Sequence, residues 1–267
     1  MRLRLVPSLV TSAFAAVMLL ASTATPASAT PASATTASAA PVKNIVLVHG
    51  AFVGGAGWRP VYDILTRDGY NVSLVQEPLT SFAEDVTATK RVIDSQDGPS
   101  VLVGHSYGGA IITEAGNDPH VSALVYIAAH ALDVGETEVG NGKKWPNLTK
   151  AVVKSPDGFL SLNPSDYPAD FAADLPRAQA EFEAHAQMPT AASVFSAQIS
   201  DTAWKVKPSW YMVAKSDRII NPDLERMYAA RAHSQTVEIE GASHSVYESH
   251  PKEVAALIEQ AAQHAQN

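Results

Sequence analysis

The chain has 267 residues, a formal net charge of −8 at neutral pH, and no cysteine. An acidic protein repels phosphate backbones and anionic lipids, so the composition argues against a nucleic-acid-binding or membrane-surface protein. Without cysteine there is no disulfide, no zinc-thiolate site and no thiol nucleophile.

The N-terminal segment has the pattern of a secretory signal peptide. Arg2 and Arg4 precede an apolar run over residues 10–21, which is shorter than the roughly 20 residues of a membrane-spanning helix. Small residues with several Ala-x-Ala cleavage sites follow. We expect residues 1–29 to be cleaved and residues 30–41 to form a low-complexity linker; an uncleaved anchor is the alternative. The mature protein, without its two leader arginines, would carry a charge of −10 and contain no membrane segment. We expect it to be a secreted or extracytoplasmic bacterial protein.

Beyond the linker, short apolar segments alternate with amphipathic ones. The apolar segments predict strands, and the amphipathic ones predict helices, the second of them capped by Ser81. Strands that are apolar throughout and separated by helices are typical of a parallel sheet covered on both faces. Residues 42–267 are therefore predicted to form one α/β domain with a largely parallel sheet flanked by helices. The predicted strands span residues 43–50, 71–76, 100–104, 121–129, 209–214 and 236–241, and the predicted helices span residues 57–70, 81–96, 110–116, 222–232 and 251–263.

A long segment over about residues 132–204 interrupts this alternation. It contains several prolines, a polar stretch and an alanine-rich helical pattern at residues 168–187, but no evident strand pattern. It leaves the carboxyl end of a predicted strand, where open α/β sheets bind ligands. We therefore expect a helical cap insertion over a site; a peripheral decoration is the alternative.

The strand at residues 100–104 runs into Gly-His-Ser-Tyr-Gly, and a helix follows directly. A G-x-S-x-G sequence between a strand and a helix is the pattern of a nucleophile elbow, which exposes its serine at the tip of a strained turn. Gly104 and Gly108 are expected because side chains there would collide with the neighbouring strand and helix. Ser106 is therefore the predicted nucleophile, and the N–H of Tyr107 at the helix N-terminus is a predicted oxyanion donor. An incidental serine in a glycine-rich turn is the alternative.

A serine nucleophile needs a base and an orienting acid, which follow it in the chain in this arrangement. Of the nine histidines, His244 alone lies in a short loop between the last predicted strand and the closing helix, so it is the predicted base. Asp217, three residues beyond the strand at 209–214, is the predicted acid. Asp133, which follows the strand at 121–129, is the alternative acid.

The turn after the first strand is expected to complete the oxyanion hole. Gly50 lets the backbone turn inward, and the N–H of Ala51 is the candidate second donor. His49 is predicted to support this turn by hydrogen bonding rather than to transfer protons. The glycines that follow match neither the dinucleotide-binding nor the Walker pattern, and no residues have metal-ligand spacing. We expect no cofactor and no metal.

Four segments carry a resemblance to a known family: VLVHGAFVGGAGW (46–58), VGHSYGG (103–109), KSDRIINP (215–222) and IEGASHSVYESHP (239–251). With these in order, the chain resembles the α/β-hydrolase superfamily over essentially all of its mature length. More narrowly, it is similar to the small esterases related to plant methylesterases and hydroxynitrile lyases. This resemblance implies a largely parallel sheet, a helical cap, no cofactor and hydrolysis through an acyl-enzyme. The chain departs from the lyases at Gly50, where they have threonine, and at Ser245, where they have lysine.

The predicted function is that of a secreted serine esterase acting on small or medium carboxylic esters, with a small-molecule ester as its partner. Related triad chemistry is the alternative among enzymes: lactone hydrolysis, perhydrolysis as in metal-free haloperoxidases, or cyanohydrin cleavage. In a different class stands a binding protein that keeps the fold without turnover.

Overall fold

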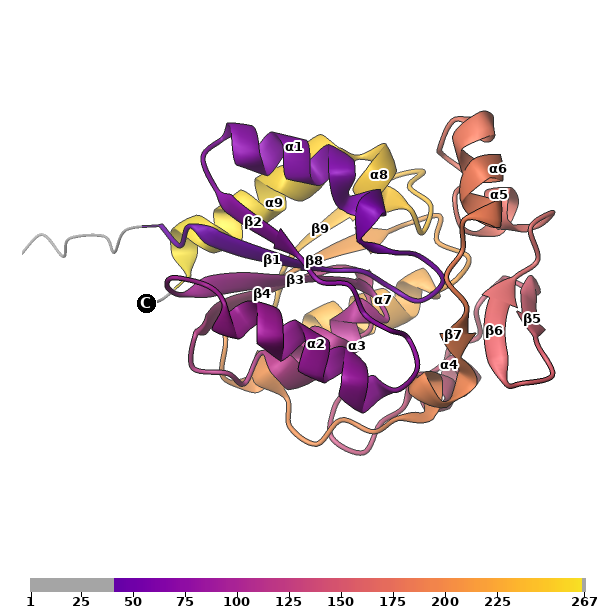
Figure 1. Cartoon of the computed structure of the whole chain (residues 1–267), viewed down its shortest axis with the longest axis horizontal. Helices are drawn as coiled ribbons and strands as arrows, with labels where there is room; N and C mark the ends of the chain where they lie inside the picture. Colours follow the sequence, from indigo (N-terminus) through magenta and orange to yellow (C-terminus); the bar gives the residue numbers. More distant parts are fainter. Residues whose placement is uncertain (1–40, 266–267) are drawn as a thin grey trace, which may run out of the picture. The chain divides into compact units, whose positions relative to one another are not determined.

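The computed structural model describes residues 41–265. Its centre is a six-stranded parallel sheet, which can be followed in Figure 1. The strand order is β2-β1-β3-β4-β8-β9, and every neighbouring pair is parallel. All six predicted strands are confirmed. The predicted signal peptide and nearly all of the linker lie outside the described residues. The strands are β1 (Asn44–Val48), β2 (Asn71–Leu74), β3 (Ser100–Ser106), β4 (Val121–Ala129), β8 (Ser209–Ala214) and β9 (Gln235–Ile239).

Helices cover both faces of this sheet (Figure 1). One face packs against α1 (Arg59–Arg67), α8 (Val246–Ser249) and α9 (Pro251–His264), and the other against α2 (Phe82–Asp94), α3 (Gly108–Ala115) and α7 (Pro222–Arg231). Side chains alternate along β3: Val101 and Val103 join the core on the α1 side, whereas Leu102 joins the core on the α2 side. This double burial explains why the strands are apolar throughout. No helix among residues 41–265 is long and apolar enough to cross a bilayer.

Local signals set where the helices begin. The hydroxyl of Ser81 accepts a hydrogen bond of 3.3 Å from the N–H of Glu84, which confirms the predicted cap of α2. The side chain of Asn221 accepts from the N–H of Asp223 at 2.9 Å, and Pro222 follows as the first residue of α7. The second of these caps lies a few residues after Asp217 and holds the start of α7 beside the sheet edge.

The segment between β4 and β8 gathers beyond the carboxyl ends of the strands (Figure 1). The prediction that it contains no strands was wrong, because three of its segments pair as a small antiparallel sheet in the order β5-β6-β7. The cap is therefore mixed rather than purely helical. Its elements are α4 (Glu138–Lys144), β5 (Val152–Lys154), β6 (Phe159–Leu162), α5 (Tyr167–Asp170), α6 (Arg177–His185) and β7 (Thr190–Ala191), followed by two 3-10 helices, Ala192–Ser196 and Ala203–Lys205.

A tight turn explains the strands of the cap. The sequence Ser155-Pro156-Asp157-Gly158 joins β5 to β6, and Gly158 has a φ of +94°, a conformation that glycine adopts without strain. Valines precede this turn and Phe159 follows it, and these residue types favour strands. The alanine-rich pattern nearby forms two short helices, because Pro176 lies between them and α6 begins only after it.

Candidate active site

Ser106 lies at the tip of a strained turn between β3 and α3. Its φ is +53°, which is uncommon for a residue with a side chain. A Cβ added at Gly104 would lie 2.6 Å from the carbonyl oxygen of Gly108, and one added at Gly108 would lie 2.5 Å from that of His49. Both glycines are thus required by close backbone approach, as the sequence predicted. Together they let β3, α3 and the end of β1 meet around the serine.

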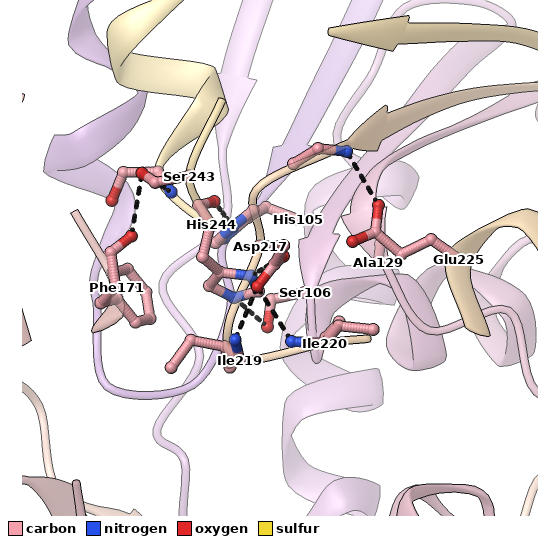
Figure 2. Close-up of polar contacts among 12 residues, drawn as sticks. His105, Ser106, Ala129, Phe171, Asp217, Ile219, Ile220, Glu225, Ser243 and His244 are labelled. Atoms are coloured by element: carbon pink, nitrogen blue, oxygen red, sulfur yellow. Dashed lines mark hydrogen bonds and ion pairs between the residues drawn. The ribbon is translucent and has the colours of Figure 1, made fainter. Parts of the chain in front are cut away.

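The fold brings Ser106, His244 and Asp217 into one hydrogen-bonded series (Figure 2). His244 Nε2 is 2.8 Å from Ser106 Oγ, and His244 Nδ1 is 2.5 Å from Asp217 Oδ2. The other carboxylate oxygen, Asp217 Oδ1, accepts hydrogen bonds from the N–H groups of Ile219 at 2.7 Å and Ile220 at 2.9 Å. All three side chains are buried, so the aspartate is held in one orientation and the imidazole is aligned between acid and hydroxyl.

Asp133, the alternative acid, lies outside this series. Its Oδ1 accepts from Lys205 Nζ at 2.5 Å and from the N–H of Val134 at 2.7 Å. Among the described residues it makes no hydrogen bond with His244. Although Asp133 follows a strand of the same sheet, its side chain belongs to an ion pair at the base of the cap.

The turn after β1 packs directly against the nucleophile. A Cβ added at Gly50 would lie only 2.7 Å from Ser106 Cβ. The N–H groups of Ala51 and Tyr107 donate to no acceptor within residues 41–265, so both are available to a ligand oxygen. These are the two amides that the sequence predicted as oxyanion donors, and they come from the two turns that flank Ser106.

His49 supports this turn from below. Its Nδ1 donates to the carbonyl oxygen of Gly50 at 2.9 Å, and its Nε2 contacts the buried carboxylate of Glu77. Burial lowers the pKa of His49, but the hydrogen bond and charge of Glu77, together with the Gly50 carbonyl and the charge of Asp85, outweigh burial, so the net shift is upward. The geometry fits the supporting role predicted for this histidine.

Sequence reasoning gave no role to His105, the first of the two variable residues of the G-x-S-x-G motif. Its Nε2 donates to the carbonyl oxygen of His244 at 2.9 Å, and the residue is fully buried. Burial and the neighbouring His244 hold the pKa of His105 well below its ordinary value, so this ring is neutral. The ring of Phe171, from the cap, meets His244 edge-on at a centroid distance of 4.7 Å. His105 and Phe171 thus fix the position of the predicted base.

Glu225, on α7, was also missed. Its Oε2 accepts a hydrogen bond of 3.0 Å from the N–H of Ala214, the last residue of β8. Burial, together with the negative charge of Asp217, raises the pKa of Glu225 well above its ordinary value. A protonated Glu225 therefore lies next to Asp217 and ties α7 to the strand that precedes that aspartate. Nothing in the local pattern of α7 marks this residue.

A cavity of about 480 Å³ opens onto Ser106. The turn after β1 contributes Ala51 and Phe52 to it, and the loop after Asp217 contributes Ile219 and Ile220. The segment between β4 and β8 supplies most of the remaining wall, which shows that it covers the site rather than decorating a remote surface. Its largely apolar contributions include Trp145, Val152, Leu160, Leu162 and Phe195.

Among residues 41–265, one group of side chains could hold a metal ion, and it lies away from the cavity at Ser106. Ligand atoms of Asp94, Asp118 and His120 lie within 4.8 Å of one another. These residues precede β3 and β4, so they lie at the edge of the sheet opposite to Ser106. The group is partly exposed and has no contact with the triad.

A model of the alpha/beta hydrolase family matches residues 45–257, which is most of the chain. The chain therefore belongs to the alpha/beta hydrolase family. The family assignment made from the four sequence motifs is thereby confirmed, as is the predicted fold class.

The individual relatives have low sequence identity to this chain, 32% and 27% in two matches. A carbendazim hydrolyzing esterase of Nocardioides sp. is 32% identical over 108 residues, but this match covers only 35% of the chain and 45% of that esterase. The alpha/beta hydrolase nvfD of Aspergillus novofumigatus is 27% identical over 244 residues, covering 82% of the chain and 96% of that protein.

Solved structures share the fold over most of the chain. Polyneuridine aldehyde esterase matches with a TM-score of 0.69 at 19% identity, covering 82% of this chain and 98% of its own. The methylesterase MES16 of Arabidopsis matches with a TM-score of 0.68 at 19% identity, again over 82% and 98%. The predicted likeness to the methylesterase branch thus holds at the level of the fold.

Proposed function

We propose that this protein is a serine esterase that cleaves small to medium carboxylic esters. The observation that carries the proposal is the hydrogen-bonded series of Ser106, His244 and Asp217 at a largely apolar cavity of about 480 Å³. The enzyme is a carboxylic-ester hydrolase, in keeping with the esterases named among its relatives and structural neighbours.

The reaction follows from the geometry. His244 Nε2 takes the proton of the Ser106 hydroxyl as Oγ attacks the ester carbonyl, and Asp217 holds the proton on Nδ1 and stabilises the imidazolium. The amides of Ala51 and Tyr107 bind the tetrahedral oxyanion, each such donor lowering the barrier by on the order of 3 kcal/mol. The leaving alcohol takes the proton from His244. Water, activated by His244, then hydrolyses the acyl-enzyme.

A binding protein without turnover has less support. It would have no use for a serine held at a φ of +53° and aligned with a buried imidazole. A fluorophosphonate probe distinguishes the two cases, because it reacts only with an activated serine. The esterase should be labelled at Ser106, and an intact protein that stays unlabelled would favour the binding protein.

The central test is a double-mutant cycle. Ser106→Ala and His244→Ala should each remove nearly all turnover of a short p-nitrophenyl ester, and the double variant should be little worse than either, because the two residues act as a unit. Ser165→Ala and His264→Ala, both at exposed positions, serve as matched controls and should keep full activity. Additive losses across the pair would contradict the assignment.

We also infer that residues 1–29 export the protein, on the basis of the charged start, short apolar run and small-residue cleavage sites. N-terminal sequencing of the protein from the medium of an expressing bacterium should find a start within the small-residue tract. Recovery of the chain only in the membrane fraction, with its leader intact, would contradict export.

A further inference from the structure

One carboxyl group in the wall of the cavity has unused hydrogen-bonding capacity. Glu138, the first residue of α4, lines the same cavity as Ser106 although it is only 8% exposed. Its Oε2 lies 3.3 Å from His130 Nε2, and its Oε1 is buried with no hydrogen-bond partner among the described residues. A buried polar atom without a partner is unfavourable, because it has lost its hydrogen bonds to water and gained none in the protein.

His130 connects this carboxyl to the nucleophile. It directly follows β4, its backbone N–H donates to the carbonyl oxygen of Ser106 at 3.1 Å, and it too lines the cavity. Its Nδ1 lies 3.3 Å from the hydroxyl of Tyr228, which accepts a hydrogen bond from Asn141 Nδ2 at 3.0 Å. The Tyr228 hydroxyl can therefore donate its proton to His130 Nδ1. With Nδ1 as the acceptor, the proton of the neutral His130 ring lies on Nε2, the atom 3.3 Å from Glu138. Side chains from α4, α7 and the end of β4 therefore hold the carboxyl in place.

Helix capping does not account for Glu138. An acid in the first turn of a helix is favoured by the helix dipole, but that role is compatible with full exposure. The start of α4 already has a cap, since the hydroxyl of Thr137 accepts from the N–H of Gly140 at 2.9 Å. The wall of the cavity is largely apolar, with Trp145, Leu160 and Leu162, and Glu138 Oε1 has no hydrogen-bond partner among the described residues. A ligand in the cavity can provide one.

We propose that Glu138, positioned by His130, binds a hydroxyl group of the substrate, so that the enzyme prefers hydroxylated esters to their hydrocarbon counterparts. The inference rests on the proposed ester hydrolysis. A hydroxyl both donates and accepts, so it can complete the hydrogen bonding of a carboxyl in either protonation state.

The electrostatics favour a neutral group over a cation. Burial raises the pKa of Glu138 to about 8, and burial with a smaller effect of His244 lowers the pKa of His130 to about 3. Both side chains are therefore uncharged at neutral pH, and an ammonium group would gain no ion pair to offset its desolvation. The subsite selects a substrate with an alcohol function away from the scissile ester.

Matched esters test this inference. Hexyl acetate is compared with 6-hydroxyhexyl acetate, methyl hexanoate with methyl 6-hydroxyhexanoate, and 6-ammoniohexyl acetate serves as the cationic analogue. In at least one pair, wild-type kcat/KM should be about tenfold higher for the hydroxylated ester.

Glu138→Met, of similar length, should reverse this preference, because an apolar wall disfavours a hydroxyl. Glu138→Gln, which keeps a donor and an acceptor, should retain most of it. Glu240→Met, at an exposed position, is the control.

Binding without turnover separates this inference from the proposed function. In Ser106→Ala, quenching of tryptophan fluorescence (Trp145 lines the cavity) should show tighter binding of 1,6-hexanediol than of 1-hexanol, and Glu138→Met should remove the difference. An enzyme that hydrolyses esters without preferring the hydroxylated member of any pair would overturn the subsite alone. So would a preference that survives in Glu138→Met, or one for the ammonium ester. Absence of all ester hydrolysis, with the diol preference intact, would overturn the proposed function alone.

Discussion

Ser106 shows how single residues set the geometry of this site. Holding a non-glycine residue at a positive φ costs on the order of 1–3 kcal/mol, and the surrounding packing has to sustain it. Gly104 and Gly108 make this possible because they remove the two Cβ atoms that would separate β3, α3 and β1. Stability is thus given up at the predicted nucleophile, a buried residue whose hydroxyl meets His244 at the end of the cavity.

The identity of the orienting acid can be tested with two equivalent substitutions. Asp217→Asn should lower kcat/KM by roughly 10⁴-fold, because the amide no longer holds the productive histidine tautomer. Asp133→Asn, which removes only the pair with the half-exposed Lys205, should change activity little and stability by about 1 kcal/mol or less. Steady-state kinetics on p-nitrophenyl acetate measures both. The opposite ranking would transfer the role to Asp133.

Two residues argue against cyanohydrin cleavage. Position 245, directly after His244, is a buried serine. The residue next to the predicted base therefore carries no positive charge that could stabilise a departing cyanide anion. Position 50 is a glycine pressed against Ser106, where a threonine Cβ would collide. The purified protein should hydrolyse short methyl esters and release no cyanide from mandelonitrile above the buffer rate. Enzyme-dependent cyanide release without ester turnover would refute this.

At the scale of elements, the β5–β6 hairpin is what turns the cap into a wall of the cavity. Val152 is the first residue of β5, and Leu160 and Leu162 lie in β6. All three side chains line the cavity. The hairpin depends on one tight turn, so its stability is local and can be changed without disturbing the sheet beneath.

Gly158 and Gly142 form a matched pair for testing the hairpin. Gly158→Ala places a side chain at a φ of +94° and should destabilise the hairpin by about 1–2 kcal/mol. Gly142→Ala, in α4 with open space around the new Cβ, should be neutral or slightly stabilising. Hydrogen exchange over residues 152–162 should accelerate only in the first variant. Equal exchange in both would show that the turn does not limit the hairpin.

Within the described part of the chain, the predicted triad is assembled from three separate loops by the sheet. The loops follow β3, β8 and β9, and β4 lies between the first two in the sheet. Apolar cores on both faces hold these strands in register, in a chain with no cysteine. The folded chain also buries acidic side chains, among them Glu138 and Glu225, and burial raises their pKa values. Because these groups bind protons differently in the folded and unfolded states, the stability of the whole molecule depends on pH.

Glu138 provides a measurable case of this linkage. Its pKa rises from an ordinary 4.5 to about 8 in the folded state. Between these values the native protein keeps a proton that the unfolded chain releases, so this group's contribution to stability is full below pH 4.5 and is lost as pH rises toward 8. Glu138→Gln removes the dependence. Its free energy of unfolding, relative to wild type, should therefore increase between pH 5 and pH 8 by about 1 kcal/mol or more.

Urea denaturation at the two pH values measures this difference. Glu240→Gln, which changes an exposed carboxylate, is the control and should show a nearly constant difference from wild type. A constant difference for Glu138→Gln as well would mean that Glu138 ionises alike in the folded and unfolded states.

The sequence by itself determined the six strands of the main sheet, the main helices, the elbow and the three candidate triad residues, because each depends on local spacing or on chain order. The strands of the cap were also encoded locally, in the Ser-Pro-Asp-Gly turn, but the prolines and alanines around it obscured them. Only the tertiary structure separated Asp217 from Asp133. Both follow strands of one sheet, and their surroundings depend on which strands are neighbours and where the cap folds back. The contacts of His105 with His244, and of Glu138 with His130, likewise needed the folded chain, since no local pattern encodes which side chains meet across separate elements.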